Sequence, residues 1–364
     1  MTKLVNIQHL RAVAAVTVVV AHLGENTNDL TEKFGDIATL PNIYGTFGVD
    51  IFFVISGFIM YYTSAADFGR PGAISDFLKR RLIRIVPIYW ILTLVQAAIL
   101  FVSRMDEPAR QITWEQMAKS LFFIPYLNDY GKFRPILGVG WSLNFEMLFY
   151  AIFAIALLFP KRLGMAVMLL TIPALVTLGS IATPSGALLA WTMPVMLEFV
   201  AGVVIGIAFQ RGMLAPRLLV PMLIATLALV VIQEVVLTSP NVPHQELSWR
   251  VSHWAFAIAI MLGALVTLQA NEEKAVNRVV TKIGDASYSL YLTHVIVLQF
   301  TTVAATVAGA SLFHPLVYFA CVFVVILPVA WYFHVKVEAP LTRYLAKRFT
   351  KRPVPVGMEP QEKT

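Results

Sequence analysis

The chain has 364 residues, of which 58% are hydrophobic and only 13% charged, and its mean hydropathy is +0.73. Soluble domains average roughly 45–50% apolar and about 25% charged residues. This composition therefore excludes a water-soluble globular protein, because the excess apolar surface must face lipid. The net charge of +7 is typical of membrane proteins with basic cytoplasmic loops, and we expect no nucleic-acid partner. The single cysteine, Cys321, excludes an intrachain disulfide and a cysteine metal cluster.

Ten segments are apolar enough to cross a bilayer, which takes roughly 20 residues in a helix. They are 5–23, 46–63, 85–102, 141–159, 164–181, 191–209, 218–237, 252–270, 286–306 and 313–334. The stretch 114–127 is shorter and mixed, and we expect it to lie at the membrane interface. No small-residue cleavage site follows the first segment, so we expect it to be retained. The sequence predicts an all-α integral membrane protein, a polytopic bundle of about ten transmembrane helices.

The loops indicate the orientation of this bundle. If both termini are cytoplasmic, 20 Lys and Arg residues lie in inner loops and 7 in outer loops, with Arg11 inside the first segment. The positive-inside rule favours that arrangement. We expect residues 1–345 to form one transmembrane domain, and 346–364 to be a basic, disordered cytoplasmic tail near anionic headgroups.

The first segment carries two ionisable residues, Arg11 and His22. Such residues are costly in a membrane and are functional hypotheses by default. Eleven helical steps place both on one stripe, with Arg11 in the inner half and His22 near the outer end. The structural alternative is an arginine that extends to the inner interface and an interfacial histidine.

Two carboxyl groups are expected at a depth similar to that of His22. Asp50 lies early in the second segment and Glu146 early in the fourth, so both fall in the outer third of the membrane. A histidine beside a carboxylate is the arrangement of a general base, because the carboxylate orients the ring and stabilises its protonated form. Alternatively, each acid is a structural partner for Arg11 or for a polar group on a neighbouring helix.

The inner end of the third segment carries Lys79, Arg80, Arg81 and Arg84. Four cations within six residues can bind phosphate groups, and arginine does so with a bidentate fork. The alternative is that this cluster only sets topology and contacts anionic lipid. Pro87 is expected in the first turn of the helix that follows.

The ninth segment carries a polar stripe in its inner half. Ser287, Tyr291 and His294 are spaced at i, i+4 and i+7 and therefore share one face of a helix. Such a stripe is suited to line a cavity, although interhelical hydrogen bonding is common for these residues in membranes. For the remaining histidines, His334 among them, the spacing names no partner, and Glu338 is expected to anchor a cytoplasmic helix end.

Six motifs together resemble one known family. In chain order they are NIQHLRAVAAVTVVVAHLG, GVDIFFVISGFIM, FLKRRLIRIVPIYW, WSLNFEMLFY, SYSLYLTH and VEAPLTR, and they extend over residues 6–343. In order and approximate spacing they resemble the acyltransferase-3 family of membrane O-acyltransferases. The first motif is most similar to that of bacterial exopolysaccharide O-acetyltransferases.

The resemblance implies a multi-pass enzyme of the bacterial inner membrane. Such an enzyme transfers an acyl group, usually acetyl, from cytoplasmic acyl-CoA to a hydroxyl of an extracytoplasmic polysaccharide or glycolipid, and no metal is implied. The family's essential Arg-x10-His pair falls on Arg11 and His22, and its membrane acid on Glu146. Its basic stretch falls on Arg80, Arg81 and Arg84. We expect Lys79, Tyr291 and His294 to help these arginines hold the acyl donor.

The chemical hypothesis is that His22 removes the proton of the sugar hydroxyl as its oxygen attacks the thioester, while Asp50 or Glu146 orients the ring. An acyl-His22 intermediate is the competing version. Ten helices with buried charges would also suit a transporter or flippase of a glycan or lipid-linked sugar, although the two halves show no repeat. A membrane sensor or scaffold is a third alternative, and it would need no catalytic histidine.

Overall fold

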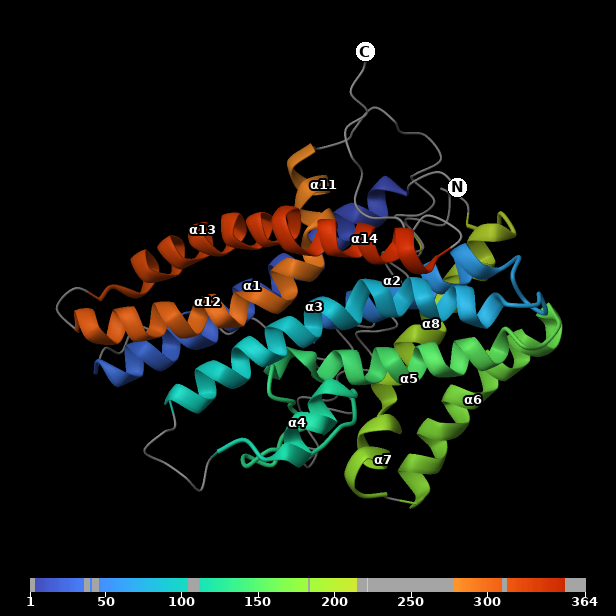
Figure 1. The fold of residues 1–364 in the computed structure, drawn as a ribbon, viewed down its shortest axis with the longest axis horizontal. Coiled ribbons are helices and arrows are strands. Elements are labelled where there is room, and N and C mark those ends of the chain that lie inside the picture. Colours follow the sequence, from blue (N-terminus) through green and yellow to red (C-terminus); the bar gives the residue numbers. More distant parts are fainter. Residues whose placement is uncertain are drawn as a thin grey trace, which may run out of the picture. The chain divides into compact units, whose positions relative to one another are not determined.

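The computed structural model describes residues 4–35, 40, 46–103, 111–182, 184–214, 221, 278–309 and 313–350 (Figure 1). Within these ranges the chain is helical, and its only β pairing is an isolated bridge between Leu127 and Phe133. The all-α prediction is therefore confirmed for the described part.

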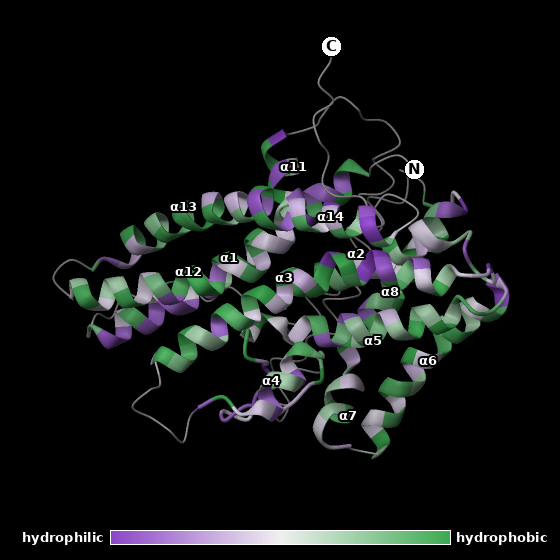
Figure 2. Cartoon of the chain, viewed as in Figure 1, coloured by the Kyte–Doolittle hydropathy of each residue, from purple (hydrophilic) through white to green (hydrophobic). Residues whose placement is uncertain are grey.

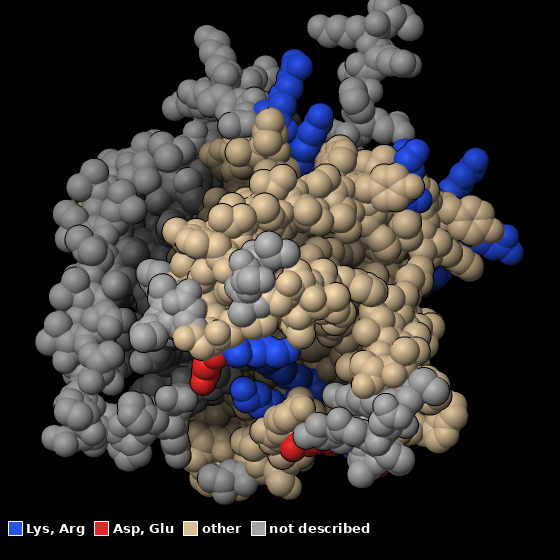
Figure 3. Space-filling view, turned by 90° about the vertical axis from the view of Figure 1, so that its left-hand side faces the viewer, with Lys and Arg blue, Asp and Glu red and all other residues tan. Residues whose placement is uncertain are grey.

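Seven described helices are long and apolar enough to cross a membrane. They are Val5–Lys33, Phe47–Ser64, Ala73–Ser103, Gly138–Ala156, Lys161–Ala182, Ser287–Ala308 and Pro315–Phe349. Each overlaps one predicted segment. The predicted segments 218–237 and 252–270 lie outside the described residues, so the total of ten remains a prediction. Figure 2 shows hydrophobic residues along most of the length of these helices, and most of the described surface in Figure 3 is formed by uncharged residues.

The predicted segment 191–209 is interrupted in the structure. Helix α7 (Gly186–Trp191) ends there, a 3₁₀ turn follows at Pro194–Met196, and α8 (Leu197–Gln210) continues. The break falls before Pro194, where Met193 is extended, because proline lacks an N–H donor and disfavours a helical residue in front of it. The resulting apolar run, Pro194–Gln210, is shorter than the seven spans.

The chain forms two compact units. The first comprises Met1–Ile7, Asp50–Lys79 and Thr113–Val276, and the second comprises Gln8–Val49, Arg80–Ile112 and Asn277–Thr364.

In the first unit, α2 (Thr46–Ser64) packs closely against α8 through glycines. A Cβ atom at Gly57 would lie 2.0 Å from the carbonyl oxygen of Phe199, and one at Gly202 would lie 2.1 Å from that of Val54. Small residues allow this approach, since packing rather than hydrophobicity drives helix association in lipid. Helices α5 (Trp141–Ala156) and α6 (Lys161–Ala182) are long helices of the same unit.

In the second unit, α1 (Val5–Lys33) runs parallel to α12 (Ser287–Ala308), beside which it lies in Figure 1. Side-chain hydrogen bonds join the two helices, and residue numbers rise along both helices from one bond to the next. The first bond is made by α11 (Arg278–Asp285), just before α12. They link His9 with Thr281, Arg11 with Ser287, His22 with His294, Asn26 with Thr302 and Lys33 with Thr306. Helix α13 (Pro315–Phe333), a π-helical turn η8 (His334–Glu338) and α14 (Ala339–Phe349) follow.

Helix α1 extends ten residues beyond its predicted end at residue 23, to Lys33. The prediction ended where charges appear, at Glu25. The helix nevertheless continues because its polar residues have partners: Thr27 and Thr31 donate to the carbonyls of Leu23 and Thr27, and Asn26 donates to Thr302. A 29-residue helix is about 43 Å long, longer than the bilayer core of about 30 Å.

Helix α3 (Ala73–Ser103) begins twelve residues before its predicted start at residue 85. Pro87 therefore lies inside the helix rather than in its first turn. Asp76 in the first turn favours this early start, since a carboxylate complements the helix dipole. Arg70 supports the turn before it by donating to Asp67 and Asp76.

Two other predicted boundaries can be compared with the structure. In the stretch 114–127, α4 (Trp114–Leu121) has eight residues, capped by Thr113 and Gln116; at about 1.5 Å per residue it is too short to span a bilayer. Residues 346–349 of the predicted tail form the last turn of α14. The remainder of the tail after Thr350 lies outside the described residues.

Candidate active site

Arg11 and His22 both face α12. The half-buried Arg11 donates from Nη2 to the hydroxyl of Ser287, at 2.9 Å. His22 is also half-buried, and its Nδ1 lies 2.9 Å from Nε2 of His294. The polar stripe predicted on the first segment is thus paired with the stripe predicted on the ninth.

The sequence predicts His22 near the outer end of its helix and His294 in the inner half of another, yet the two rings are hydrogen-bonded. The reason is the true length of α1, in which His22 has eleven helical residues after it. His22 therefore lies in the interior of α1, level with the second turn of α12.

The two imidazole rings meet edge to edge. Their centroids are 5.1 Å apart, their planes differ by 19°, and only 2.9 Å separates the facing nitrogen atoms. Rings stacked face to face could not bring two nitrogens so close at that centroid distance. The N–H of one ring consequently points toward the in-plane lone pair of the other, which is favourable hydrogen-bond geometry.

His294 is the buried member of the pair, with no exposed surface. Its second ring nitrogen, Nδ1, lies 3.0 Å from the carbonyl oxygen of Leu290 one turn earlier. Tyr291, also predicted to hold the donor, is buried beside it, with ring centroids 6.2 Å apart.

A histidine–carboxylate pair does occur in the second unit, at a place that the sequence interpretation missed. His334 Nδ1 lies 2.8 Å from Glu338 Oε2, and Ser289 donates to the same oxygen. All three side chains are buried. The signal was the i, i+4 spacing of His334 and Glu338, which puts both on one helix face. Because the serine bonds the carboxylate and not the ring, this is not a nucleophile triad.

Asp50 lies in the first unit, where Glu198 of α8 is its neighbour. The two carboxyl groups lie close together, and both side chains are buried, with relative exposures of 2% and 0%. Among the described residues, Asp50 Oδ2 and both Glu198 oxygens have no hydrogen-bond donor. The sequence interpretation does not single out Glu198, although an acid at the start of an apolar segment indicates a functional or structural role.

Glu146 is more exposed than Asp50 and Glu198. Its Oε1 accepts a hydrogen bond from Ser56 of α2 at 2.9 Å and another from Tyr150, one turn later on α5. Asp50 and Glu146 belong to the first unit and His22 to the second. A carboxylate beside His22 therefore remains a prediction, while the partner observed at Nδ1 of His22 is His294.

The basic cluster lies within the first turns of α3. Lys79 is exposed, and Arg80, Arg81 and Arg84 are half-buried. Near them, Tyr288 of α12 donates to the carbonyl of Ile85 at 2.8 Å. The cluster thus occupies a continuous helix, and not a loop in front of one.

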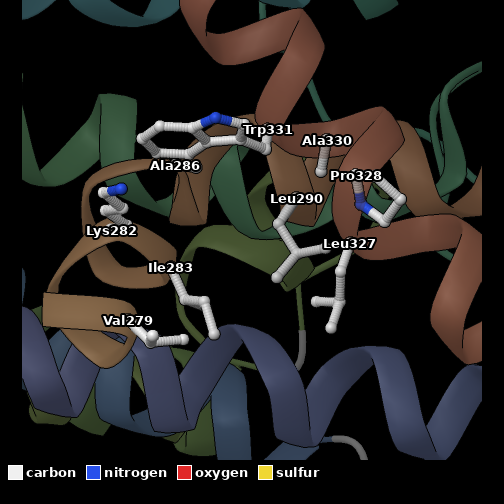
Figure 4. A pocket seen from close by; sticks show the side chains of 9 residues that line it. All are labelled: Val279, Lys282, Ile283, Ala286, Leu290, Leu327, Pro328, Ala330 and Trp331. Atoms are coloured by element: carbon white, nitrogen blue, oxygen red, sulfur yellow. The ribbon is translucent and has the colours of Figure 1, made fainter. Parts of the chain in front are cut away.

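A cavity of about 300 Å³ lies between α11, α12 and α13 (Figure 4). It is lined by Val279, Lys282, Ile283, Ala286, Leu290, Leu327, Pro328, Ala330 and Trp331. Its one cation, Lys282, lies over the ring of Trp331 at 5.7 Å. The cavity is otherwise apolar, and the residues predicted to hold the acyl donor are not among those that line it.

The described residues contain no group of three or more His, Cys, Asp or Glu side chains that could hold a metal ion.

These features define a multi-pass membrane protein with a histidine pair inside its helices. An acyltransferase domain model, Acyl_transf_3, matches residues 4–335, and the chain belongs to this acyltransferase-3 family. It is therefore a membrane O-acyltransferase.

Two relatives agree with this assignment. The exopolysaccharide production protein ExoZ of Rhizobium meliloti (strain 1021) is 35% identical over 284 residues, covering 76% of this chain and 83% of the relative. The acyltransferase MdmB of Streptomyces mycarofaciens is 23% identical over 321 residues, covering 82% of this chain and 80% of the relative. The comparison with solved structures gives no match.

Proposed function

We propose that this enzyme transfers an acetyl group from cytoplasmic acetyl-CoA to a hydroxyl of an extracytoplasmic polysaccharide or glycolipid. In this proposal it lies in the bacterial inner membrane with ten transmembrane helices and both termini in the cytoplasm. The likeness to ExoZ, which is an exopolysaccharide production protein, favours a polysaccharide acceptor.

The observation that carries the proposal is the placement of His22. It is half-buried inside α1, its ring is held by His294, and Arg11 on the same stripe is held by Ser287. A base must be close to its proton and must be oriented by a further group, and the histidine pair supplies such an orientation.

The basic cluster of α3 suits the anionic end of the donor. Arg80, Arg81 and Arg84 are half-buried, so each can present a guanidinium fork from a fixed helical position. Lys79 is exposed and would add a mobile charge at the edge of the cluster. Tyr291 and His294 would line the path of the donor toward His22.

The proposed reaction conserves protons. His22 takes the hydroxyl proton as the oxygen attacks the thioester carbonyl carbon, the carbon–sulfur bond breaks, and the proton passes to the leaving thiolate. Arg11 assists at the donor, and either Asp50 or Glu146 is the acid proposed to stabilise the protonated ring. General-base assistance of this kind contributes about 10²–10⁴-fold.

The decisive experiment is His22→Ala in the full-length chain, compared with wild type at equal membrane abundance. NMR of the purified surface glycan would measure its O-acetyl content. We expect the acetyl signals to fall at least about 100-fold while the amount of exported polymer stays normal.

His314→Ala is the matched control, because His314 is exposed at the start of α13 and we expect it to leave acetylation unchanged. Full acetylation with blocked polymer export in His22→Ala would contradict the proposal and favour transport. Recovery of the wild-type enzyme with an acetyl group covalently bound to His22 would replace the one-step chemistry by a two-step version.

A further inference from the structure

The hydrogen bonds around His294 determine where its protons lie. The carbonyl oxygen of Leu290 can only accept, so Nδ1 of His294, 3.0 Å away, must carry a hydrogen. The other nitrogen, Nε2, faces Nδ1 of His22 at 2.9 Å. Each ring nitrogen of His294 therefore has a known partner, and neither partner is an anion.

His294 must be the neutral ring in this arrangement. A buried imidazolium is stable only beside a compensating charge, and here a backbone carbonyl and a second imidazole occupy the two nitrogens of a ring with no exposed surface. A neutral ring with its hydrogen on Nδ1 has its lone pair on Nε2. Nε2 of His294 is consequently an acceptor.

The contact with His294 also determines which nitrogen of His22 carries a hydrogen. If Nε2 of His294 accepts, Nδ1 of His22 must be the donor in the 2.9 Å contact. A neutral His22 with its hydrogen on Nδ1 holds its own lone pair on Nε2. The direction of donation therefore runs from His22 through His294 to the carbonyl of Leu290, and it selects one of the two tautomers of His22.

We propose that His294 is a positioning residue that holds His22 in the Nδ1–H tautomer, so that Nε2 is the basic atom in acyl transfer. This inference rests on the proposed function. It assigns His294 a role beyond the donor binding expected from the sequence. During the reaction Nε2 of His22 takes the hydroxyl proton and returns it to the leaving thiolate, and the hydrogen on Nδ1 stays in place throughout.

The packing of the two helices fixes this pair in register. The α1–α12 bonds between Arg11 and Ser287 on one side and Asn26 and Thr302 on the other enclose the histidine pair. A sliding movement of either helix would break all of them together. The ring of His294 is further oriented by its bond to the carbonyl one turn earlier on its own helix.

The test compares two replacements of His294 that differ in one property. Glutamine places an amide oxygen that can accept from Nδ1 of His22, whereas phenylalanine fills the ring's space without an acceptor. The assay would use membranes containing the full-length chain and its native glycan, with radiolabelled acetyl-CoA as the probe, and would measure the initial rate of label transfer per folded protein.

We expect His294→Phe to lower the rate about 10–100-fold, by analogy with the loss of a hydrogen-bond partner that orients a metal-binding histidine. His294→Gln should recover most of that loss. His9→Gln is the matched control, because His9 lies on α1 and bonds the hydroxyl of Thr281, and it should leave the rate unchanged.

The outcomes separate this inference from the proposed function. Full activity in His22→Ala would overturn the proposed function itself. Loss in His22→Ala combined with a wild-type rate in His294→Phe would overturn only the positioning role. Equal, complete loss in both His294 variants, with folding intact by size-exclusion chromatography, would also overturn it, because acceptance of one hydrogen bond would not be what His294 supplies.

Discussion

The two units of the chain each contain a pair of neighbouring titratable side chains, but the two pairs are built in opposite ways. In the second unit His22 and His294 form a chain of alternating donors and acceptors that ends on the carbonyl of Leu290. In the first unit Asp50 and Glu198 bring together two acceptors, and three of their four oxygens have no donor among the described residues. Two carboxyl groups form a hydrogen bond only when one of them is protonated.

The difference shows what each pair can do. A complete donor–acceptor chain gives a proton a defined direction and suits a base that must present one particular nitrogen. A pair of facing acids holds a proton in place and suits a contact between helices. The close approach of α2 and α8 at Gly57 and Gly202 agrees with such a structural role.

The largest effect is expected at that close approach. In Gly202→Ala the new Cβ would meet the carbonyl oxygen of Val54 at 2.1 Å, and backbone cannot move aside easily. We expect a loss of about 3 kcal/mol in the free energy of unfolding, the upper part of the usual range for overpacking. SDS-induced unfolding in mixed micelles would measure it.

Gly24→Ala on α1 is the matched control, because nothing lies within 4 Å of a Cβ atom there. Alanine is the better helix former by about 1 kcal/mol, so this variant should be slightly stabilised. Equal effects of the two substitutions would mean that α2 and α8 do not meet through Gly202.

The next effect concerns the facing acids. Asp50→Ala removes the polar neighbour of buried Glu198 and leaves an empty space beside it, which should cost about 2 kcal/mol. Asp50→Asn supplies an amide N–H that donates to Glu198, so it should stay within about 0.5 kcal/mol of wild type. Exposed Asp29 gives the control Asp29→Ala, and the same unfolding measurement applies. Greater damage from asparagine than from alanine would exclude a stabilising contact between Asp50 and Glu198.

Hydropathy and residue spacing predict the helices and their polar faces, but not every helix end. Hydropathy locates seven of the long helices, because each must present an apolar surface to lipid. It ends α1 too early at Glu25, since the tertiary partners of Asn26 are invisible in a local window. Spacing correctly places Arg11 with His22, and Ser287 with His294, on common faces.

Spacing alone could not show that these two faces meet, because 272 residues separate His22 from His294. The motif resemblance assigns His22 and His294 to the site, but only the structure shows that they pair. Glu198 and the His334–Glu338 pair could have been found from the sequence, the first as an acid in an apolar segment and the second from its i, i+4 spacing. Thus composition predicts the architecture, while the partner of each buried group follows only from the fold.

A third prediction compares the acid that has donors with the pair that lacks them. Glu146 accepts from both Ser56 and Tyr150. Tyr150→Phe removes one donor and should cost about 1.5 kcal/mol, a typical value for a hydrogen bond to a carboxylate, and Ser56→Ala should cost about 1 kcal/mol. In the Glu146→Gln background, Tyr150→Phe and Ser56→Ala should each cost less than in wild type. An unchanged cost of Tyr150→Phe in the Glu146→Gln background would show that Tyr150 stabilises the unit through ring packing alone.

The smallest change in stability is expected where neutral hydrogen bonds hold the register of α1 and α12. Asn26 donates to Thr302 at 2.8 Å, one turn beyond His22. A double-mutant cycle of Asn26→Ala and Thr302→Val should give a coupling of about 0.6 kcal/mol, the average for such bonds between membrane helices. That value is too small to unfold the unit, yet loss of the bond would allow the two helices to shift where the histidines meet. The acyl-transfer rate of Thr302→Val should therefore fall by a larger factor than its stability does. A rate equal to that of wild type would show that His22 and His294 keep their alignment without this neighbour.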